Sequence, residues 1–116
     1  MVLENALLNT TTRVEMSGTV HGTATEKAII HYLIRRVGVQ DCHRIQKTSC
    51  QILAFNQFTS KRKRCSIALK RGDTVRIYCK GAPEIILEHA KSFLDVDGCV
   101  KDLDVQGMQN TIDALA

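Results

Sequence analysis

The strongest structural constraint in this sequence is a pair of alternating segments joined by a turn. Every second residue is apolar over residues 65–69 and again over residues 75–79, and Arg71-Gly72-Asp73 lies between the two segments. A period of two is typical of β-strands, and a glycine next to an aspartate favours a tight turn. Residues 64–80 therefore predict a β-hairpin, which makes at least this part of the sheet antiparallel.

The same alternation divides the second strand of this hairpin into two faces. Its apolar residues share one face, and the polar face carries Arg76, Tyr78 and Lys80. Lys80 would emerge at the end of the strand directly before Gly81, where a backbone without a side chain lets a ligand approach closely. A basic residue at such a turn is a candidate anion site. A strand, a glycine turn and a proline-started helix also produce this pattern for structural reasons alone.

Helical signals flank the hairpin on both sides. Thr23 and Glu26 have the spacing of a capping box, and apolar residues at helical spacing follow, which predicts a helix over 24–37 that Gly38 closes. A proline followed by a glutamate predicts the first turn of a helix over 83–90. The other predicted elements are helices over 2–9 and 103–115, a strand over 48–55, a strand or loop over 9–17, and a turn over 95–98.

This order of elements predicts the α+β class, in which helices flank an antiparallel β-sheet, within a single domain over residues 1–116. With 44% apolar and 24% charged residues the composition is that of a globular domain. The apolar runs are far shorter than the ~20 residues of a membrane span, and no signal peptide is visible, so we expect an intracellular chain. Five scattered cysteines predict reduced thiols and no metal site.

Positive charge is concentrated in one place. The formal net charge is +4, and the run Lys61-Arg62-Lys63-Arg64 supplies all of it. Just before this run, Phe58 stands among polar residues, and an exposed ring beside cations is how proteins hold a nucleobase and its phosphates. The alternatives are a ring packed beneath the loop, a solvated or nuclear-localisation-like basic run, and a nucleic-acid-binding module that uses residues 61–64 as its phosphate patch.

Glu26 has two possible roles. As the last residue of a capping box, its carboxylate can bond back to the backbone of Thr23. As a carboxylate at the start of a helix, it can instead accept a hydrogen bond from the amino group of a base. The spacing alone is compatible with both.

Three segments, in this order, resemble the nucleotide-binding domain of P-type cation-transporting ATPases. The most specific is Lys80-Gly81-Ala82-Pro83-Glu84, which matches the K-G-A-P-E signature of that family without a substitution. Residues 58–63 are similar to its F-x-S-x-R-K segment, and residues 22–30 are similar to its G-x-x-T-E-x-A-[LI] segment. The resemblance covers about residues 18–90.

The resemblance implies a role for each matching residue. Phe58 would stack on adenine, Glu26 would accept a hydrogen bond from the adenine amino group, and Lys80 would form a wall of the adenine pocket. Lys63 would reach toward the phosphates, and Gly81 would allow the nucleotide to approach closely.

The match around Phe58 leaves two further candidates. Ser60 and Arg62 could share the phosphate contacts of this segment. Phe55, which Asn56 follows, could be mistaken for the stacking ring. In the F-x-S-x-R-K segment the lysine stands five residues after the phenylalanine. Five residues after Phe55 stands Ser60, whereas five residues after Phe58 stands Lys63. Phe58 is therefore the better match.

The resemblance also implies what surrounds this chain. The family's phosphorylated D-K-T-G-T motif, its Mg²⁺-binding carboxylates, its transmembrane helices and a later arginine do not occur in this sequence. We therefore expect a fragment of a larger membrane pump that binds ATP or ADP without hydrolysing it, has no catalytic or metal-ligating residue of its own, and leaves Mg²⁺ to the parent.

The parent would be an ATP-hydrolysing ion translocase, and the expected partners are its phosphorylation and actuator domains. We expect a monomer on the cytoplasmic side of a membrane that does not bind nucleic acid. The K-G-A-P-E segment favours cation pumps over lipid flippases and heavy-metal pumps. Residues 22–30 favour calcium pumps of the plasma-membrane type.

Overall fold

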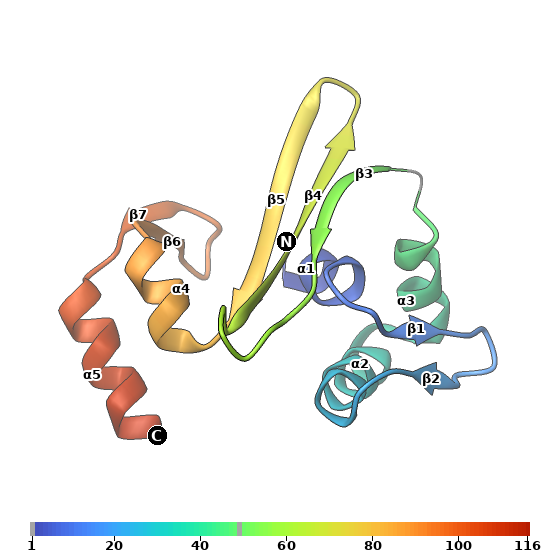
Figure 1. Cartoon of the computed structure of the whole chain (residues 1–116), viewed down its shortest axis with the longest axis horizontal. Coiled ribbons are helices and arrows are strands. Elements are labelled where there is room, and N and C mark those ends of the chain that lie inside the picture. Colours follow the sequence, from blue (N-terminus) through green and yellow to red (C-terminus); the bar gives the residue numbers. More distant parts are fainter. Residues whose placement is uncertain (1, 49) are drawn as a thin grey trace. The chain divides into compact units, whose positions relative to one another are not determined.

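A computed structural model describes residues 2–48 and 50–116, and the chain divides into two compact units, Met1–Lys80 and Gly81–Ala116. The elements of the first unit are, in chain order, α1 (Val2–Leu8), β1 (Arg13–Val14), β2 (Val20–His21), α2 (Ala24–Val37), α3 (Val39–Gln46), β3 (Gln51–Asn56), β4 (Arg64–Arg71) and β5 (Thr74–Gly81), whose last residue begins the second unit (Figure 1). Those of the second unit are α4 (Pro83–His89), β6 (Ser92–Leu94), β7 (Val100–Asp102) and α5 (Val105–Leu115).

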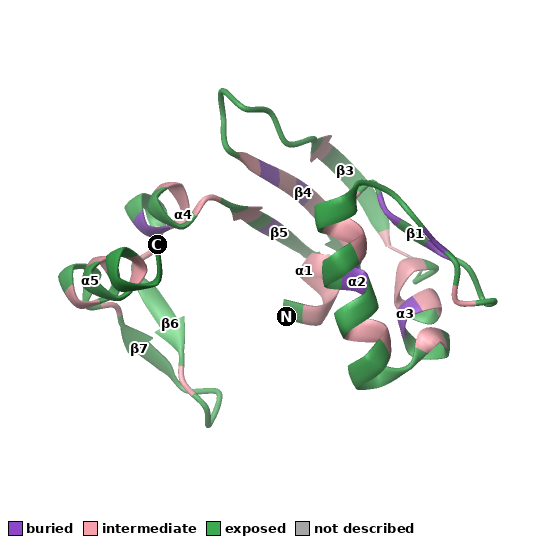
Figure 2. Cartoon of the chain, turned by 90° about the horizontal axis from the view of Figure 1, so that it is seen from below, coloured by how far each residue is buried: buried purple, intermediate pink, exposed green. Residues whose placement is uncertain are grey.

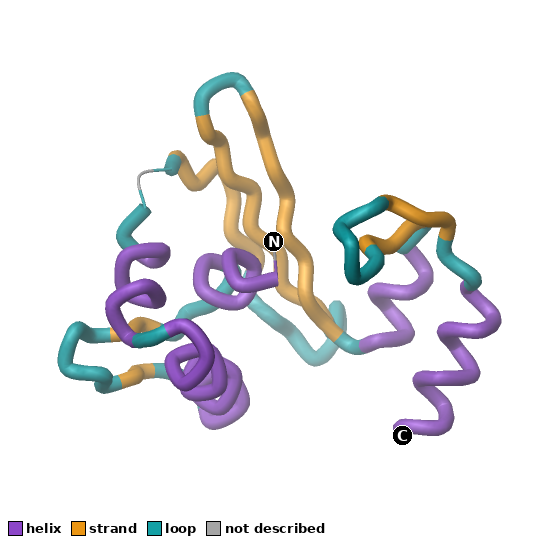
Figure 3. Tube along the Cα trace, turned by 180° about the vertical axis from the view of Figure 1, so that it is seen from behind, coloured by secondary structure: helices purple, strands orange, loops and turns teal. Residues whose placement is uncertain are grey.

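The largest sheet has the strand order β3-β4-β5, and Figure 3 traces these three strands side by side. β3 runs antiparallel to β4, with Phe55 opposite Ile67. β4 and β5 are joined at Gly72, whose φ of 57° lies in the left-handed region that glycine adopts without strain. The predicted hairpin and the α+β class with an antiparallel sheet are both confirmed.

Two clusters of buried side chains stabilise the first unit (Figure 2). The first lies where α1, α2, α3 and the β1–β2 hairpin meet, and it consists of Leu7, Val14, Val20, Ile30 and Cys42. The second lies on one face of the three-stranded sheet and consists of Ile67, Leu69 and Tyr78, with Leu8, Cys50 and Phe55 packed against it. Leu7 and Leu8 of α1 therefore serve different clusters, so α1 joins the helices to the sheet.

The covered face of β5 is the opposite of the one that the apolar pattern indicates. Tyr78 is 6% exposed and belongs to the second cluster, whereas Ile77 is 69% exposed and Val75 is 53% exposed. The reason is that α1 covers the Tyr78 side, where the Tyr78 hydroxyl donates a hydrogen bond to Glu4. Lys80 shares this side with Tyr78 and is partly buried, so it does not stand on an open polar face.

Two amide side chains fix the segment that leaves α1. Asn9 is fully buried, and its Nδ2 donates to the carbonyls of Cys65 (3.3 Å) and Tyr78 (3.3 Å) on neighbouring strands. Gln46 of α3 donates from Nε2 to the carbonyl of Thr12 (2.9 Å). The backbone of residues 9–12 is therefore held at both ends.

The sequence patterns did not predict α3. Gly38 ends α2 by donating its N–H to Ile34 (2.9 Å), and it also opens α3, because its carbonyl accepts the N–H of Cys42 (3.3 Å). Val39, Cys42 and Ile45 have helical spacing and are covered, which was the available signal. On α2, too, the covered side was not evident from the pattern: Ile30 is buried, while its neighbour Ile29 is 41% exposed.

The second unit is a small helical hairpin with a two-stranded sheet. α4 contacts α5, and β6 pairs antiparallel with β7 around the predicted turn at residues 95–98. Leu87 is its buried side chain. α5 begins at an N-cap, where the Asp104 carboxylate accepts the N–H of Gly107 (3.0 Å). These short strands were not predicted, because three residues each are too few to show alternation.

Candidate functional site

The loop with the basic run and the residue Lys80 lie at the same end of the three-stranded sheet. The loop 57–63, which carries Phe58 and the basic run, connects the end of β3 to the start of β4. Because neighbouring strands are antiparallel, the end of β5, with Lys80, lies at this same end of the sheet (Figure 1). The loop 57–63 and Lys80, which are far apart in the sequence, thus lie at the same end of the sheet in the first unit.

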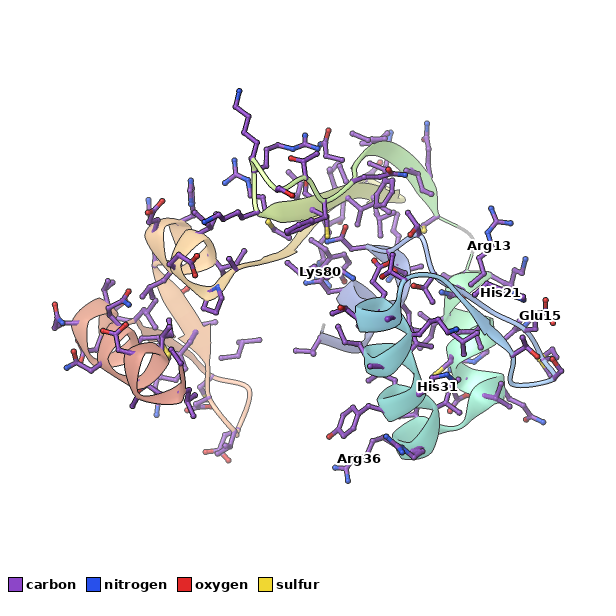
Figure 4. All side chains as sticks on the ribbon, turned by 60° about the horizontal axis from the view of Figure 1, so that its bottom comes forward. Arg13, Glu15, His21, His31, Arg36 and Lys80 are labelled. Atoms are coloured by element: carbon purple, nitrogen blue, oxygen red, sulfur yellow. The ribbon has the colours of Figure 1, made fainter. Side chains whose placement is uncertain are left out.

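Glu26 and Lys80 form an ion pair at this end. The Nζ atom of Lys80, labelled in Figure 4, lies 3.8 Å from Oε1 of Glu26. Glu26 stands in the first turn of α2, and Lys80 precedes the last residue of β5. Both side chains are about one quarter exposed, at 23% and 26%, so the pair is accessible from solvent without being fully hydrated.

The capping box of α2 is only half formed. Thr23 is the N-cap and its hydroxyl accepts the N–H of Glu26 (3.4 Å), as predicted. Among the hydrogen bonds of the described residues, none joins the Glu26 carboxylate to the backbone N–H of Thr23. The carboxylate turns instead toward hydroxyl groups of the segment after α1, namely Thr10 (2.7 Å), Thr11 (3.2 Å) and Thr12 (3.3 Å).

The surroundings of Glu26 favour its charged form. Burial of the carboxyl acts to raise its pKa, but the hydroxyl of Thr10, the ammonium of Lys80 and the two further hydroxyls outweigh burial and hold the pKa below its ordinary value. At neutral pH the group is therefore a carboxylate, which accepts hydrogen bonds and donates none.

Phe55 and Phe58 have different environments, and Phe58 is exposed as predicted. Phe55 packs against the second cluster, and Phe58 is 58% exposed. The face of the Phe58 ring can therefore be stacked upon by a planar group from solvent.

Arg62 is engaged within its own loop. Its Nη2 donates to the carbonyl of Gln57 (2.6 Å), and its Nε donates to the hydroxyl of Thr59 (3.3 Å). These bonds span the position of Phe58 and hold the loop that carries the ring. Ser60 and Lys63 are exposed, and contacts of all three residues with phosphate stay predictions.

Two glycines stand beside these residues. Gly81 is the exposed last residue of β5. Gly22 has a φ of 152°, and a side chain there would place its Cβ atom 2.6 Å from Oγ1 of Thr12. Glycine at position 22 therefore permits the close approach of the hydroxyl segment to the start of α2. In the sequence, Gly22 stands out only as part of a family-like segment. Nothing local to Thr10, Thr11 and Thr12 predicts that this threonine run meets a helix start.

Within residues 2–48 and 50–116 no group of three or more His, Cys, Asp or Glu side chains is placed to hold a metal ion. The five cysteines are free thiols, two of them buried, Cys42 and Cys65. No helix of the described part of the chain has the length and apolar character needed to cross a membrane.

Comparison with known proteins identifies the class to which this fold and site belong. Over residues 1–116 the chain matches the family described as P-type ATPase, cytoplasmic domain N, and it therefore belongs to this family. The predicted resemblance is confirmed.

Calcium-transporting ATPases are among the relatives of this chain. The chain is 30% identical, over 99% of its length, to the probable calcium-transporting ATPase 8, plasma membrane-type, of Oryza sativa subsp. japonica, of which it covers 12%. It is 38% identical over 72% of its length to the calcium-transporting ATPase 3, plasma membrane-type, of the same organism, covering 8%. It is 35% identical over 75% of its length to the calcium-transporting ATPase 9, plasma membrane-type, of Arabidopsis thaliana, covering 8%. The chain thus spans about a tenth of the length of these relatives.

Proposed function

We propose that this chain binds ATP and ADP at the end of its sheet and that, within a longer P-type pump, it positions the γ-phosphate for transfer to an aspartate of a separate phosphorylation domain. The names of the relatives favour calcium as the ion that the parent transports. The description of the family as a cytoplasmic domain favours the cytoplasmic side of a membrane as the location of this domain. The phosphorylation and actuator domains of the parent would be its partners.

The observation that carries this proposal is the contact between Glu26 and Lys80. These residues come from two different family-like segments, and the fold brings their charged atoms to 3.8 Å. A partly buried carboxylate beside an ammonium presents an acceptor for an exocyclic amino group and a donor for a ring nitrogen or a phosphate oxygen.

The remaining contacts follow from the loop 57–63. The exposed ring of Phe58 supplies a stacking surface for the base, and Lys63 supplies a cation for the phosphates, with Ser60 and Arg62 as further candidates. Gly81 leaves room for the nucleotide beside Lys80. Because most of these contacts go to the base, we expect ATP and ADP to bind with similar affinity.

A nuclear magnetic resonance titration with ATP, ADP and a short DNA duplex tests the proposal. We expect ATP and ADP to shift the amide signals near Glu26, Phe58 and Lys80 with similar dissociation constants, and DNA to leave them unchanged. Shifts confined to residues 61–64, equally strong with DNA, would instead identify a nucleic-acid-binding module.

The chain alone is expected to bind ATP without consuming it. Phosphoryl transfer needs an in-line nucleophile and Mg²⁺ held by carboxylates. After α4, the carboxylate of Asp95 accepts backbone N–H groups within a turn, and that of Asp104 caps α5. Incubation with γ-labelled ATP and Mg²⁺ should yield neither phosphoenzyme nor steady phosphate release. An acid-stable phosphoprotein in purified material would contradict this expectation.

A further inference from the structure

The Glu26 carboxylate is surrounded by threonine hydroxyls. Thr10 lies 2.7 Å from Oε1, whereas Thr11 (3.2 Å), Thr12 (3.3 Å) and the N-cap Thr23 (3.3 Å) lie near Oε2. We call Thr10, Thr11 and Thr12, which come from the segment between α1 and β1, the threonine clamp. They reach Glu26 across the fold and are not part of its own helix.

Several contacts hold the threonine clamp in place. Thr12 is 3% exposed, its carbonyl accepts from Gln46 (2.9 Å), and its side chain fits where Gly22 has no Cβ. The Thr10 hydroxyl also accepts the backbone N–H of Thr12 (3.1 Å), which directs the hydroxyl proton toward the carboxylate. The clamp is thus ordered by groups other than Glu26.

The hydroxyls of the clamp and of Thr23 occupy acceptor positions of the Glu26 carboxylate. An ionised carboxylate has about four acceptor positions, and four hydroxyls already lie within hydrogen-bonding distance. Three of these hydroxyls lie at Oε2, which has about two acceptor positions, so an amino group that binds at Oε2 has to replace one of them. Thr11 is the exposed member of the clamp, whereas Thr12 is buried and Thr10 makes the shortest bond.

We propose that the threonine clamp orients Glu26 toward the base of the nucleotide, with Thr10 as the positioning residue that stays bonded and Thr11 as the hydroxyl that the amino group of the base replaces. This inference rests on the proposed function. It assigns the preference for a 6-aminopurine to Glu26 together with Thr10. Thr10 and Thr11 then have opposite effects on affinity, although they are adjacent threonines that contact the same carboxylate.

The test compares four variants of the chain. Thr10→Val and Thr11→Val each remove one hydroxyl while keeping the shape of the side chain, and Thr10→Ser keeps the hydroxyl. Thr25→Val is the matched control, because Thr25 is exposed on α2 and no hydrogen bond within the described residues joins it to Glu26. Calorimetry gives the dissociation constants of ATP and of purine riboside triphosphate, which lacks the 6-amino group.

For Thr10→Val we expect ATP affinity to fall about 3- to 10-fold, the range of one hydrogen bond, with purine riboside triphosphate unchanged and with rescue in Thr10→Ser. For Thr11→Val we expect ATP affinity to rise about 2- to 3-fold, because no hydroxyl has to be displaced. A Thr10→Val protein that binds ATP like Thr25→Val, or that loses both nucleotides equally while folded, would overturn the proposal. So would a Thr11→Val protein that loses ATP.

A second measurement needs no nucleotide. The carboxyl carbon of Glu26 can be titrated by nuclear magnetic resonance, with Lys80 and the Cys65 thiol as the neighbouring titratable groups. Thr10→Val should raise the Glu26 pKa relative to the wild type, whereas Thr25→Val should not. If the wild type binds ATP, but neither the nucleotide affinities nor the Glu26 pKa change in the threonine variants, only the proposed role of the clamp is wrong. If the wild type binds no ATP, the proposed function fails, and the clamp's assignment to the base fails with it.

Discussion

At the residue scale, two phenylalanines three positions apart have different roles. Phe55 is on β3 opposite Ile67 and packs against the second cluster, whereas Phe58 is in the loop that follows and is 58% exposed. Aromatic rings are scarce in this chain, at 4% of residues, so an exposed ring forgoes core stabilisation that the fold could have used. This favours a binding role for Phe58.

We expect Phe58→Ala to weaken ATP binding by about 1 to 3 kcal/mol, the range of base stacking, and to leave thermal unfolding nearly unchanged. Phe55→Ala should do the reverse and lower the free energy of unfolding by about 2 kcal/mol, because its ring is half-buried. Calorimetry for binding and urea denaturation for stability check both variants. If Phe58→Ala bound ATP normally but had a much lower melting temperature, Phe58 would be the core residue and Phe55 the stacking ring.

Lys63 has an unusual backbone for its residue type. Its φ is 52°, in the left-handed region, which costs a residue with a Cβ atom about 1 kcal/mol. Lys63→Gly should therefore be more stable than Lys61→Gly, the matched change in the same loop, while binding ATP more weakly than the wild type for lack of the cation. Equal stabilities of the two glycine variants in urea denaturation would contradict the strain at position 63.

At the element scale, the connection between α1 and the sheet depends on Asn9. Its Nδ2 donates to the carbonyls of Cys65 on β4 and Tyr78 on β5, and to the side chain of Asn5 (3.1 Å). Since α1 also carries Leu7 and Leu8 into the two clusters, this amide fixes the helix against both. The segment of the threonine clamp begins at the next residue.

Asn9→Ala should lower the free energy of unfolding by about 1 to 3 kcal/mol, because it leaves buried carbonyls without their donor. Asn110→Ala, an exposed asparagine on α5, is the control and should change stability by less than about 0.5 kcal/mol. Urea denaturation measures both. A neutral Asn9→Ala variant would show that packing alone holds α1.

At the scale of the whole molecule, carboxylates tie the first unit together. The Tyr78 hydroxyl and Arg71 (3.0 Å), both of the sheet, donate to Glu4 of α1 and hold the pKa of Glu4 below its ordinary value. Glu26 ties the start of α2 to the clamp and to β5, and its pKa is lowered as well. Both groups are thus bound in their charged forms in the folded state.

Acid should therefore destabilise this protein. A carboxyl with a lowered folded-state pKa stabilises the fold above its unfolded pKa of about 4.3, and this contribution is lost as the pH falls through the lower folded value. We expect the melting temperature to decline as the pH falls below about 4.5. Glu4→Gln should be less stable at pH 7 and should show a shallower decline. A parallel decline in the variant would exclude Glu4 as a contributor.

Local signals in the sequence determined most elements of this fold. The alternation around Gly72, the N-cap Thr23 and the proline at the start of α4 act within a few residues, and the structure contains each of these elements at the predicted place. The exposure of Phe58 and the family membership also followed from residue type and order alone. Where the preference of a segment is local, its sequence is sufficient to reveal it.

Only the tertiary structure decided which faces are covered and which distant groups meet. Alternation shows that β5 has two faces, but α1 determines that Tyr78 and Lys80 lie on the covered one and that Ile77 does not. Residues 10–12 show no pattern that predicts a contact with Glu26, because that contact depends on how α1, α2 and α3 pack together. Such packing depends on how many side chains from different segments are buried together, so the sequence of any single segment cannot predict it.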